Sequence, residues 1–262
     1  YFFLFHNIYY QIYTLNNTIV LKNRDGLEVH FIISKRDERG FKLSDSSVFN
    51  AKEIYNIRIV PTEYTDTLVS DIRIVSKYIL VGLQNSDYPL KKSIMESIKT
   101  EYKETYGGTQ LNFIGPSSFT LQQINLIESD DDSIPYVLDN FCVTDKADGE
   151  RRILYISNEG RVYLISTKLE LQYTGTYVTN ELLYGIILDG EYITHDKSGN
   201  KINMYAAFDV YILNIAIKGV LQKKDIRPFE FAKNRYKLLK KCISDITESL
   251  TLETGAIFSV HV

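Results

Sequence analysis

Lys146–Arg151 reads KADGER, and this hexapeptide carries the strongest structural and chemical signal in the chain. Two β-rich runs flank it, Phe141–Val143 before it and Ile153–Ile156 after it. It is therefore predicted to be a polar loop that leads into a strand. Taken alone, it fits either an ordinary charged hairpin loop or a catalytic loop.

A lysine in such a loop must lose its proton before it can act as a nucleophile. Its ordinary pKa of ~10.4 would have to fall by roughly two to three units, which costs about 3–4 kcal/mol. Partial burial and a nearby cation lower the pKa of a lysine, and Arg151 could be that cation or a clamp for phosphate. Asp148 could accept hydrogen bonds from the lysine or from a sugar, and Gly149 lets the backbone turn beside a bulky nucleotide.

Three later segments extend the pattern in order along the chain. They are Leu188–Ile193 (LDGEYI), Phe208–Tyr211 (FDVY) and Gly255–Phe258 (GAIF). Each alone fits a hairpin turn or a core strand. Behind KADGER, they resemble motifs III, IIIa and IV of the covalent nucleotidyltransferases, which are the mRNA capping enzymes and the DNA and RNA ligases.

The closest resemblance within that superfamily is to the guanylyltransferase of mRNA capping enzymes from large cytoplasmic DNA viruses and virus-like elements. Val143–Arg152, Asp189–Tyr211 and Arg227–Phe229 carry it, and it covers roughly residues 110–258. It implies an α+β fold, in which a nucleotidyltransferase domain with a mixed or antiparallel sheet follows part of a β-rich, tunnel-type triphosphatase module.

The resemblance predicts three regions. Residues 1–90 would form the C-terminal part of the RNA triphosphatase tunnel, residues 91–110 a helical linker, and residues 111–262 the guanylyltransferase domain. The sequence starts without Met and stops at Val262 in mid-pattern, so we expect a fragment truncated before motif V and the OB-fold.

Local patterns predict the elements of the first half. Residues 29–33, 57–60 and 72–75 are predicted strands, and in the last two an arginine alternates with β-branched residues. Residues 36–40 are predicted to be a turn. Apolar residues at every fourth position predict a helix over residues 93–106, which a Gly-Gly pair ends.

The second half is predicted to be β-rich, with one helix near its end. Asn158–Gly160 is a hairpin signal, and residues 186–188 and 206–208 are predicted buried strands. Residues 194–201 are predicted to turn. Pro228 is predicted to open a helix.

The resemblance implies a two-step reaction that needs Mg²⁺ or Mn²⁺. Lys146 attacks GTP to give a lysyl-GMP intermediate, and the GMP then moves to the 5′-diphosphate end of RNA. The residues that this assigns to the nucleotide are Asp148, Gly149, Arg151, Glu191 and Phe208, and those assigned to the metal are Glu191 and Asp209. Phe208 fits a core position equally well.

Two segments leave their roles open. Ser166 and Lys168 follow a predicted strand beside the motif I hairpin, so they either contact the edge of the base or form an ordinary polar turn. Thr254 stands where the resembled family has an acid, and Glu253 is one place too early. The N-terminal part lacks a clear pair of Glu-x-Glu strands, so no triphosphatase residue is assigned.

Two alternative functions remain, an ATP-dependent polynucleotide ligase that forms lysyl-AMP and an inactive docking subunit of a transcription complex. The expected partners are GTP, the 5′ end of RNA, and an RNA polymerase or methyltransferase subunit, but not a membrane. The expected location is cytoplasmic, in a viral factory, a virion or a virus-like element.

Composition excludes several classes. The net charge of −3 excludes a basic coat that would grip duplex DNA over the whole surface. No apolar run approaches the ~20 residues of a membrane span. Cys142 and Cys242 are too few for a disulfide scaffold or a zinc cage and favour a reducing compartment.

Two charged segments have two interpretations each. The basic segment 218–241 is either an RNA path or a solvated helix face, and the acidic run 128–133 is either a solvated loop or a metal site.

Overall fold

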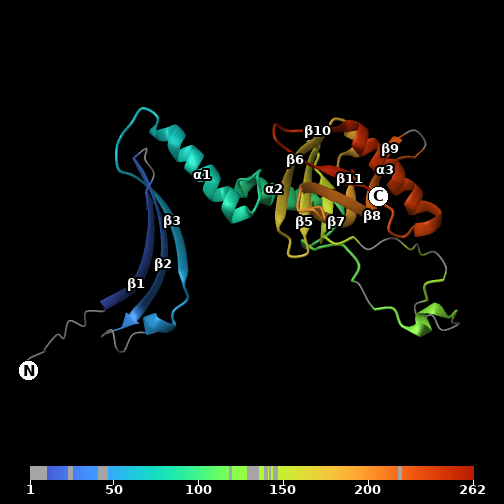
Figure 1. The fold of residues 1–262 in the computed structure, drawn as a ribbon. Helices are drawn as coiled ribbons and strands as arrows, with labels where there is room; N and C mark the ends of the chain where they lie inside the picture. The colour runs from blue at the N-terminus through green and yellow to red at the C-terminus, as the bar shows by residue number, and fades with distance from the viewer. Residues whose placement is uncertain are drawn as a thin grey trace, which may run out of the picture. The chain divides into compact units, whose positions relative to one another are not determined.

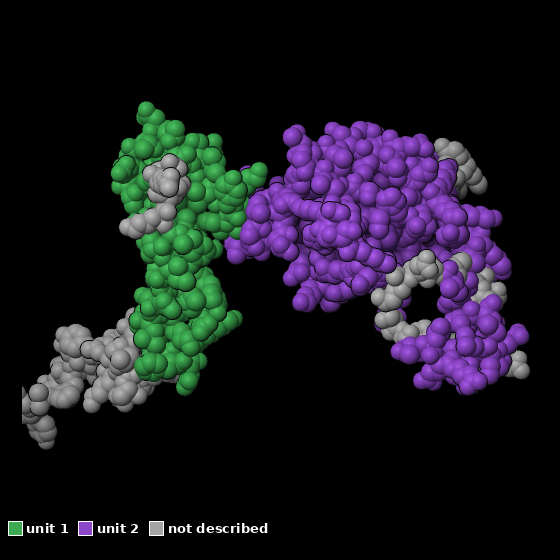
Figure 2. Space-filling view, viewed as in Figure 1, with its two compact units in different colours: residues 1–79 green, residues 80–262 purple. Residues whose placement is uncertain are grey.

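A computed structural model describes residues 11–22, 26–40, 47–117, 120–128, 136–138, 141, 143, 147–217 and 220–262. It contains helices and mostly antiparallel sheets, which confirms the predicted α+β class. The chain divides into two compact units, residues 1–79 and residues 80–262 (Figure 2). This division falls inside a helix, and the functions predicted for the separate regions stay predictions.

The first unit is built on an antiparallel sheet of three strands in the order β1-β2-β3. The strands are β1 (Gln11–Lys22), β2 (Leu27–Gly40) and β3 (Ile54–Pro61), and a short 3₁₀ turn spans Ser47–Asn50. The strands predicted at 29–33 and 57–60 are confirmed. The predicted turn at 36–40 is wrong, because β2 pairs with β1 as far as Gly40, opposite Gln11.

The strand predicted at residues 72–75 is also wrong, because this segment lies within helix α1 (Leu68–Gln84). Leu68, Ile72, Val75 and Ile79 recur every three or four residues and are half-buried, so a helical period overrides the local alternation. In the described part of the chain, no helix combines the length and the apolar character that crossing a lipid bilayer requires.

The two faces of the three-stranded sheet differ in character. One face carries a groove of about 520 Å³. It is lined by Thr14, Asn16, Thr18, His30, Ile32, Ser34, Arg36, Ile54, Asn56 and Arg58. The residues that alternate with these along the strands face the other side of the sheet. They include the exposed side chains of Ile19, Leu21, Ile33 and Tyr55. The predicted separation of arginines from isoleucines therefore holds for Arg58, with Ile57 and Ile59 on the opposite side.

The second unit is built on an eight-stranded sheet in the order β10-β6-β5-β4-β7-β8-β11, with β9 also paired to β8 (Figure 1). All pairs are antiparallel except β11 with β8. The strands are β4 (Glu150–Ile156), β5 (Arg161–Ser166), β6 (Leu171–Val178), β7 (Ile187–His195), β8 (Lys201–Ile217), β9 (Val220–Asp225), β10 (Leu250–Leu252) and β11 (Ser259–His261). The predicted hairpin at Asn158–Gly160 is confirmed by the pair β4–β5. The strands predicted at residues 186–188 and 206–208 are confirmed as parts of β7 and β8, and the turn predicted at residues 194–201 is confirmed in the connection between them.

Helices cover the two faces of this sheet. Ile98 and Tyr102 of α2 (Lys92–Thr105) pack with Ile153 and Tyr155 of β4 on one face. On the other face, α3 (Tyr236–Ser249) buries Leu239, Cys242, Ile243 and Ile246 against a second cluster. The helix predicted over residues 93–106 is thereby confirmed as α2. The second predicted helix is confirmed as α3, but Pro228 does not open it, because Pro228 lies in a turn and α3 begins at Tyr236. Short 3₁₀ turns span Gln123–Leu126 and Glu181–Leu183, and a π-helical turn, Phe231–Arg235, precedes α3.

Candidate active site

The candidate site lies on the paired strands β4 and β7, near the start of β4. Arg151 stands opposite Glu191, and Ile153 stands opposite Asp189. Because side chains alternate along a strand, Arg151, Asp189 and Glu191 fall on one face of the sheet, which is the face that α2 covers. Lys146 lies outside the described residues, and the chain is described again from Ala147.

Gly149 connects the KADGER loop with the LDGEYI segment on β7. Its backbone N–H donates to Glu191 Oε2 at 3.1 Å. A Cβ added at this position would lie 2.7 Å from the carbonyl oxygen of Tyr192, which is closer than real contacts allow. The end of the loop therefore needs glycine here, and the same close approach brings it to the Glu191 carboxylate.

Arg151 is held on several sides. Its Nε and Nη2 donate to Asp189 Oδ1 and Oδ2 at 3.1 and 2.6 Å, and Nη1 donates to the carbonyl oxygen of Pro116 at 2.6 Å. The rings of Phe113 and Phe208 flank the guanidinium, with centroids 5.4 and 5.9 Å away. The hydrogen bonds from Arg151 to Asp189 raise the pKa of the arginine above its ordinary value. The guanidinium is thus a fixed positive charge with a defined orientation.

Asp189 was not among the predicted site residues, yet it anchors the cluster. Its side chain is fully buried and accepts a further hydrogen bond from the hydroxyl of Tyr211. Burial and the Asp189 charge raise the pKa of Tyr211, which therefore stays a donor. The signal was present in the sequence, because alternation in LDGEYI places Asp189 and Glu191 on the same face.

Asp209 is engaged by an arginine that the sequence did not connect with it. Both its oxygens accept from Arg235, at 3.0 Å from Nε and 2.7 Å from Nη2. Burial raises the pKa of Asp209, and the Arg235 hydrogen bonds oppose that rise. The pair fastens the turn before α3 to β8, and it occupies the oxygens that a metal would need.

The described residues contain no group of three or more His, Cys, Asp or Glu side chains that could hold a metal ion by themselves. Mg²⁺ commonly binds one or two carboxylates and completes its shell with water and substrate phosphates. The carboxylate of Glu191 fits such a partial site, since a single oxygen is engaged by Gly149 among the contacts that the structure shows. Asp209 does not fit it.

Ser166 is the last residue of β5, and Lys168 lies in the turn that leads to β6. The Ser166 hydroxyl accepts from the backbone N–H groups of Lys168 and Glu170, and its side chain is buried. Ser166 pairs with Arg152 and so shares its face, opposite to that of Arg151. The structure does not bring Ser166 together with Arg151 and Glu191.

Asp148 lies at a separate depression on the Arg152 side of the sheet. This depression has a volume of about 280 Å³ and is also lined by Gly149, Gln172 and Tyr192. Among the described residues, Nε of Arg152 is buried without a hydrogen-bond partner, and its Nη2 donates to Glu150. Asp148 is exposed.

The GAIF segment, Gly255–Phe258, lies between the edge strand β10 and β11. Glu253 accepts from the Tyr173 hydroxyl at 2.6 Å, and its N–H donates to the carbonyl oxygen of Gly175. Glu253 is therefore tied to β6, and Thr254 follows it. Of the acidic run 128–133, the residues after Glu128 lie outside the described part.

No family model matches the sequence. The chain is similar to the protein named "Probable mRNA-capping enzyme" of Acanthamoeba polyphaga mimivirus, with 26% identity over 176 residues. The match covers 64% of this chain and 14% of the mimivirus protein. It supports a relationship with a viral capping enzyme, and the chain spans only a small part of that protein's length.

Proposed function

We propose that this chain carries the guanylyltransferase step of mRNA capping. The neutral Nζ of Lys146 attacks the α-phosphorus of GTP, a nitrogen–phosphorus bond forms, and the bond to the β-phosphate breaks to release pyrophosphate. A terminal oxygen of an RNA 5′-diphosphate then attacks the same phosphorus. The bond to Lys146 breaks, and the product is a GpppN end.

The observation that carries this proposal is the Arg151–Asp189 pair beside Glu191. A buried carboxylate fixes the arginine so that it presents positive charge next to the KADGER loop without having to reorganise. Among the described residues, the hydrogen bonds to Asp189 and Pro116 use three of the five N–H groups of the guanidinium. The guanidinium is partly exposed and suits phosphate or ribose oxygens, and Phe208 offers a half-exposed ring beside it.

A divalent metal would be held by Glu191 together with the phosphates of GTP. When bound, it would neutralise negative charge on the triphosphate. Glu191 also orients Gly149, so it would act on the loop even without a metal. The roles of Asp148, Ser166 and Lys168 toward the nucleotide stay predictions.

The polar groove of the first unit supports a second, related proposal, that its sheet is part of a tunnel wall that faces phosphates. Arg36, Arg58 and His30 line the groove, and no acid is among its lining residues. Triphosphate hydrolysis is not assigned to these residues. The nearby acid that the structure places on this face, Glu28, is paired with His30.

The test is covalent labelling of the 262-residue chain. With radiolabelled GTP and Mg²⁺ or Mn²⁺, the protein should keep label through denaturing electrophoresis. Lys146→Ala and Lys146→Arg should both lose it, because arginine stays protonated at any workable pH. A pocket that hydrogen-bonds guanine leaves groups unpaired with adenine, at ~1–3 kcal/mol for each group.

The outcomes separate the candidate functions. Labelling by GTP alone supports capping, labelling by ATP alone supports a polynucleotide ligase, and no labelling of the folded chain supports a docking subunit. Label retained by Lys146→Ala at the wild-type level would refute the assigned nucleophile.

A further inference from the structure

We propose that the first turns of α3 form a binding surface for the phosphates of the RNA whose 5′ end receives GMP. This inference rests on the proposed function. The surface, here called the α3 basic face, consists of Lys237, Lys240 and Lys241.

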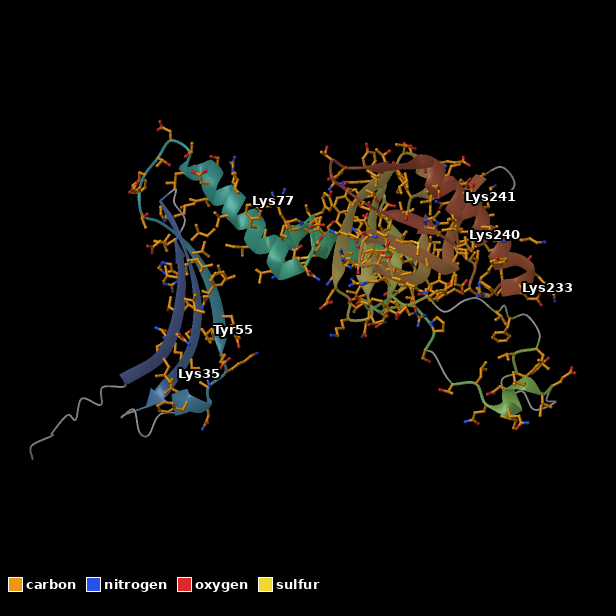
Figure 3. All side chains as sticks on the ribbon, viewed as in Figure 1. Lys35, Tyr55, Lys77, Lys233, Lys240 and Lys241 are labelled. Carbon is orange, nitrogen blue, oxygen red and sulfur yellow. The ribbon has the colours of Figure 1, made fainter. Side chains whose placement is uncertain are left out.

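The three lysines share one side of the helix. Lys237 is three and four residues from Lys240 and Lys241, which places neighbouring side chains on one face. All three are exposed, and no acidic group of the described residues lies within ion-pair distance of them. Figure 3 shows Lys240 and Lys241 on α3, and Lys233 on the turn before it. Lys233 pairs with Glu230.

The order of charges along α3 opposes helix stability. Cations stabilise the C-terminal end of a helix and anions its N-terminal end. In α3 the lysines stand in the first two turns, the acids Asp245 and Glu248 stand near the end, and the first turn has no acid. Like charges three or four residues apart also repel. Lys240 Nζ also lies 4.5 Å from the ring centroid of Tyr236 on the same helix. The charge order of the three lysines is nevertheless unfavourable for the helix, and they add to the positive potential of its N-terminal end.

The turn that precedes the α3 basic face is tied to the strand beside the candidate site. Arg235, immediately before α3, reaches back to Asp209 on β8. Asp209 stands directly opposite Asp189 in the pairing of β7 with β8, and Asp189 holds Arg151. One ion pair thus links the turn before the basic helix to the strand beside the site. Because α3 packs on the other face of the sheet, an RNA whose end lies at Arg151 would pass around the sheet by way of this turn to reach α3.

The chemistry of the surface fits a strand of phosphates. Lysine is a compact, mobile point charge that holds backbone phosphates without reading sequence. The chain as a whole carries a net charge of −3, so it has no general affinity for polyanions. Binding should therefore depend on a local group of cations and should weaken as salt rises.

The experiment measures binding of an RNA of about 20 nucleotides to the full chain by fluorescence anisotropy over a range of salt. Lys237→Glu, Lys240→Glu and Lys241→Glu are combined in one variant. We expect binding to weaken about tenfold or more at low salt. Each phosphate contact contributes ~0.7 to the slope of log K against log salt, so the loss of three contacts should reduce the size of that slope by about 2. The control reverses the same number of charges on another helix of this unit, at Lys92, Lys99 and Lys103 of α2.

A second readout separates this proposal from the one on which it rests. Both variants should form the GMP adduct as the parent does, and thermal melting should show that both are folded. If the parent forms no adduct, the guanylyltransferase proposal fails, while the RNA measurement is still decisive. Failure of the parent to bind RNA, unchanged binding in the α3 variant, or an equal loss in the α2 control would overturn the α3 basic face.

Discussion

Asp189 is the residue on which the site depends most, because its buried carboxylate is satisfied by Arg151 and Tyr211 alone among the described contacts. Asp189→Asn keeps the shape but leaves the guanidinium without its counter-charge. Breaking a buried ion pair costs about 3–5 kcal/mol, and the partial exposure of Arg151 favours the lower end. Urea unfolding should show this loss, and labelling by GTP should fall with it.

The control is an exposed ion pair in the same unit. Asp87→Asn removes the partner of Lys201, and both side chains are largely exposed, so the loss should stay below about 1 kcal/mol. Equal destabilisation by the two substitutions would show that the Arg151–Asp189 pair is no stronger than a surface pair.

The sequence could predict part of this residue-level picture. Arg151 and Glu191 follow from motif order and strand alternation, and the structure brings them together across β4 and β7. The pairing of Asp209 with Arg235 could not be predicted, because the two residues meet only when the turn before α3 packs on β8. The capture of Ser166 by its own turn also depends on how β5 and β6 connect.

At the scale of elements, sequence periodicity predicted most strands and helices but failed in α1. Alternation over residues 72–75 is too short a window to separate a strand from a helix. The longer spacing from Leu68 to Ile79 indicates the helix that forms. The turn predicted at residues 36–40 is wrong for another reason. Arg36 and Asp37 pair with Thr14 and Tyr13 on the neighbouring strand, and this pairing extends β2 through the polar segment.

The central strands share a property that predicts alkaline unfolding. Burial raises the pKa of tyrosines on β4, β5, β6, β7 and β8 above the ordinary value of 10. They are Tyr155, Tyr163, Tyr173, Tyr192, Tyr205 and Tyr211. Because the folded pKa is the higher one, the unfolded chain loses these protons first. Their contribution to stability is complete below pH 10 and is lost as pH rises from there toward the folded values.

Absorbance of tyrosinate and circular dichroism measure this together. These buried tyrosines should ionise only as the secondary structure is lost, whereas the chain in denaturant should titrate in one step near the ordinary value of 10. Burial also raises the pKa of the Cys242 thiol to about 12, so thiol reactivity should appear with the same transition. Tyrosinate formed by the whole set while the sheet stays intact would contradict the assignment of burial.

At the scale of the whole molecule, the two units differ sharply in how much apolar surface they bury. In the described part of residues 1–79, Leu27 and Val48 are the buried hydrophobic side chains. Large apolar side chains of the same unit, such as Ile19 and Tyr55, remain exposed. Residues 80–262 contain both extended core clusters. Burial of apolar surface is the main favourable contribution to folding, so stability must reside in the second unit.

This difference predicts how the two units behave when separated. Residues 80–262 expressed alone should melt cooperatively, within about 5 °C of the full chain, since both core clusters are retained. Residues 1–79 alone should show no cooperative transition, because a three-stranded sheet with so few buried side chains cannot offset its conformational entropy.

Hydrogen exchange on the full chain gives an independent check. The amides of β1–β3 should exchange far faster than those of β4, β5 and β7, which lie inside the eight-stranded sheet. Comparable protection in both sheets, or a cooperative melt of residues 1–79, would show that the first unit is stable by itself.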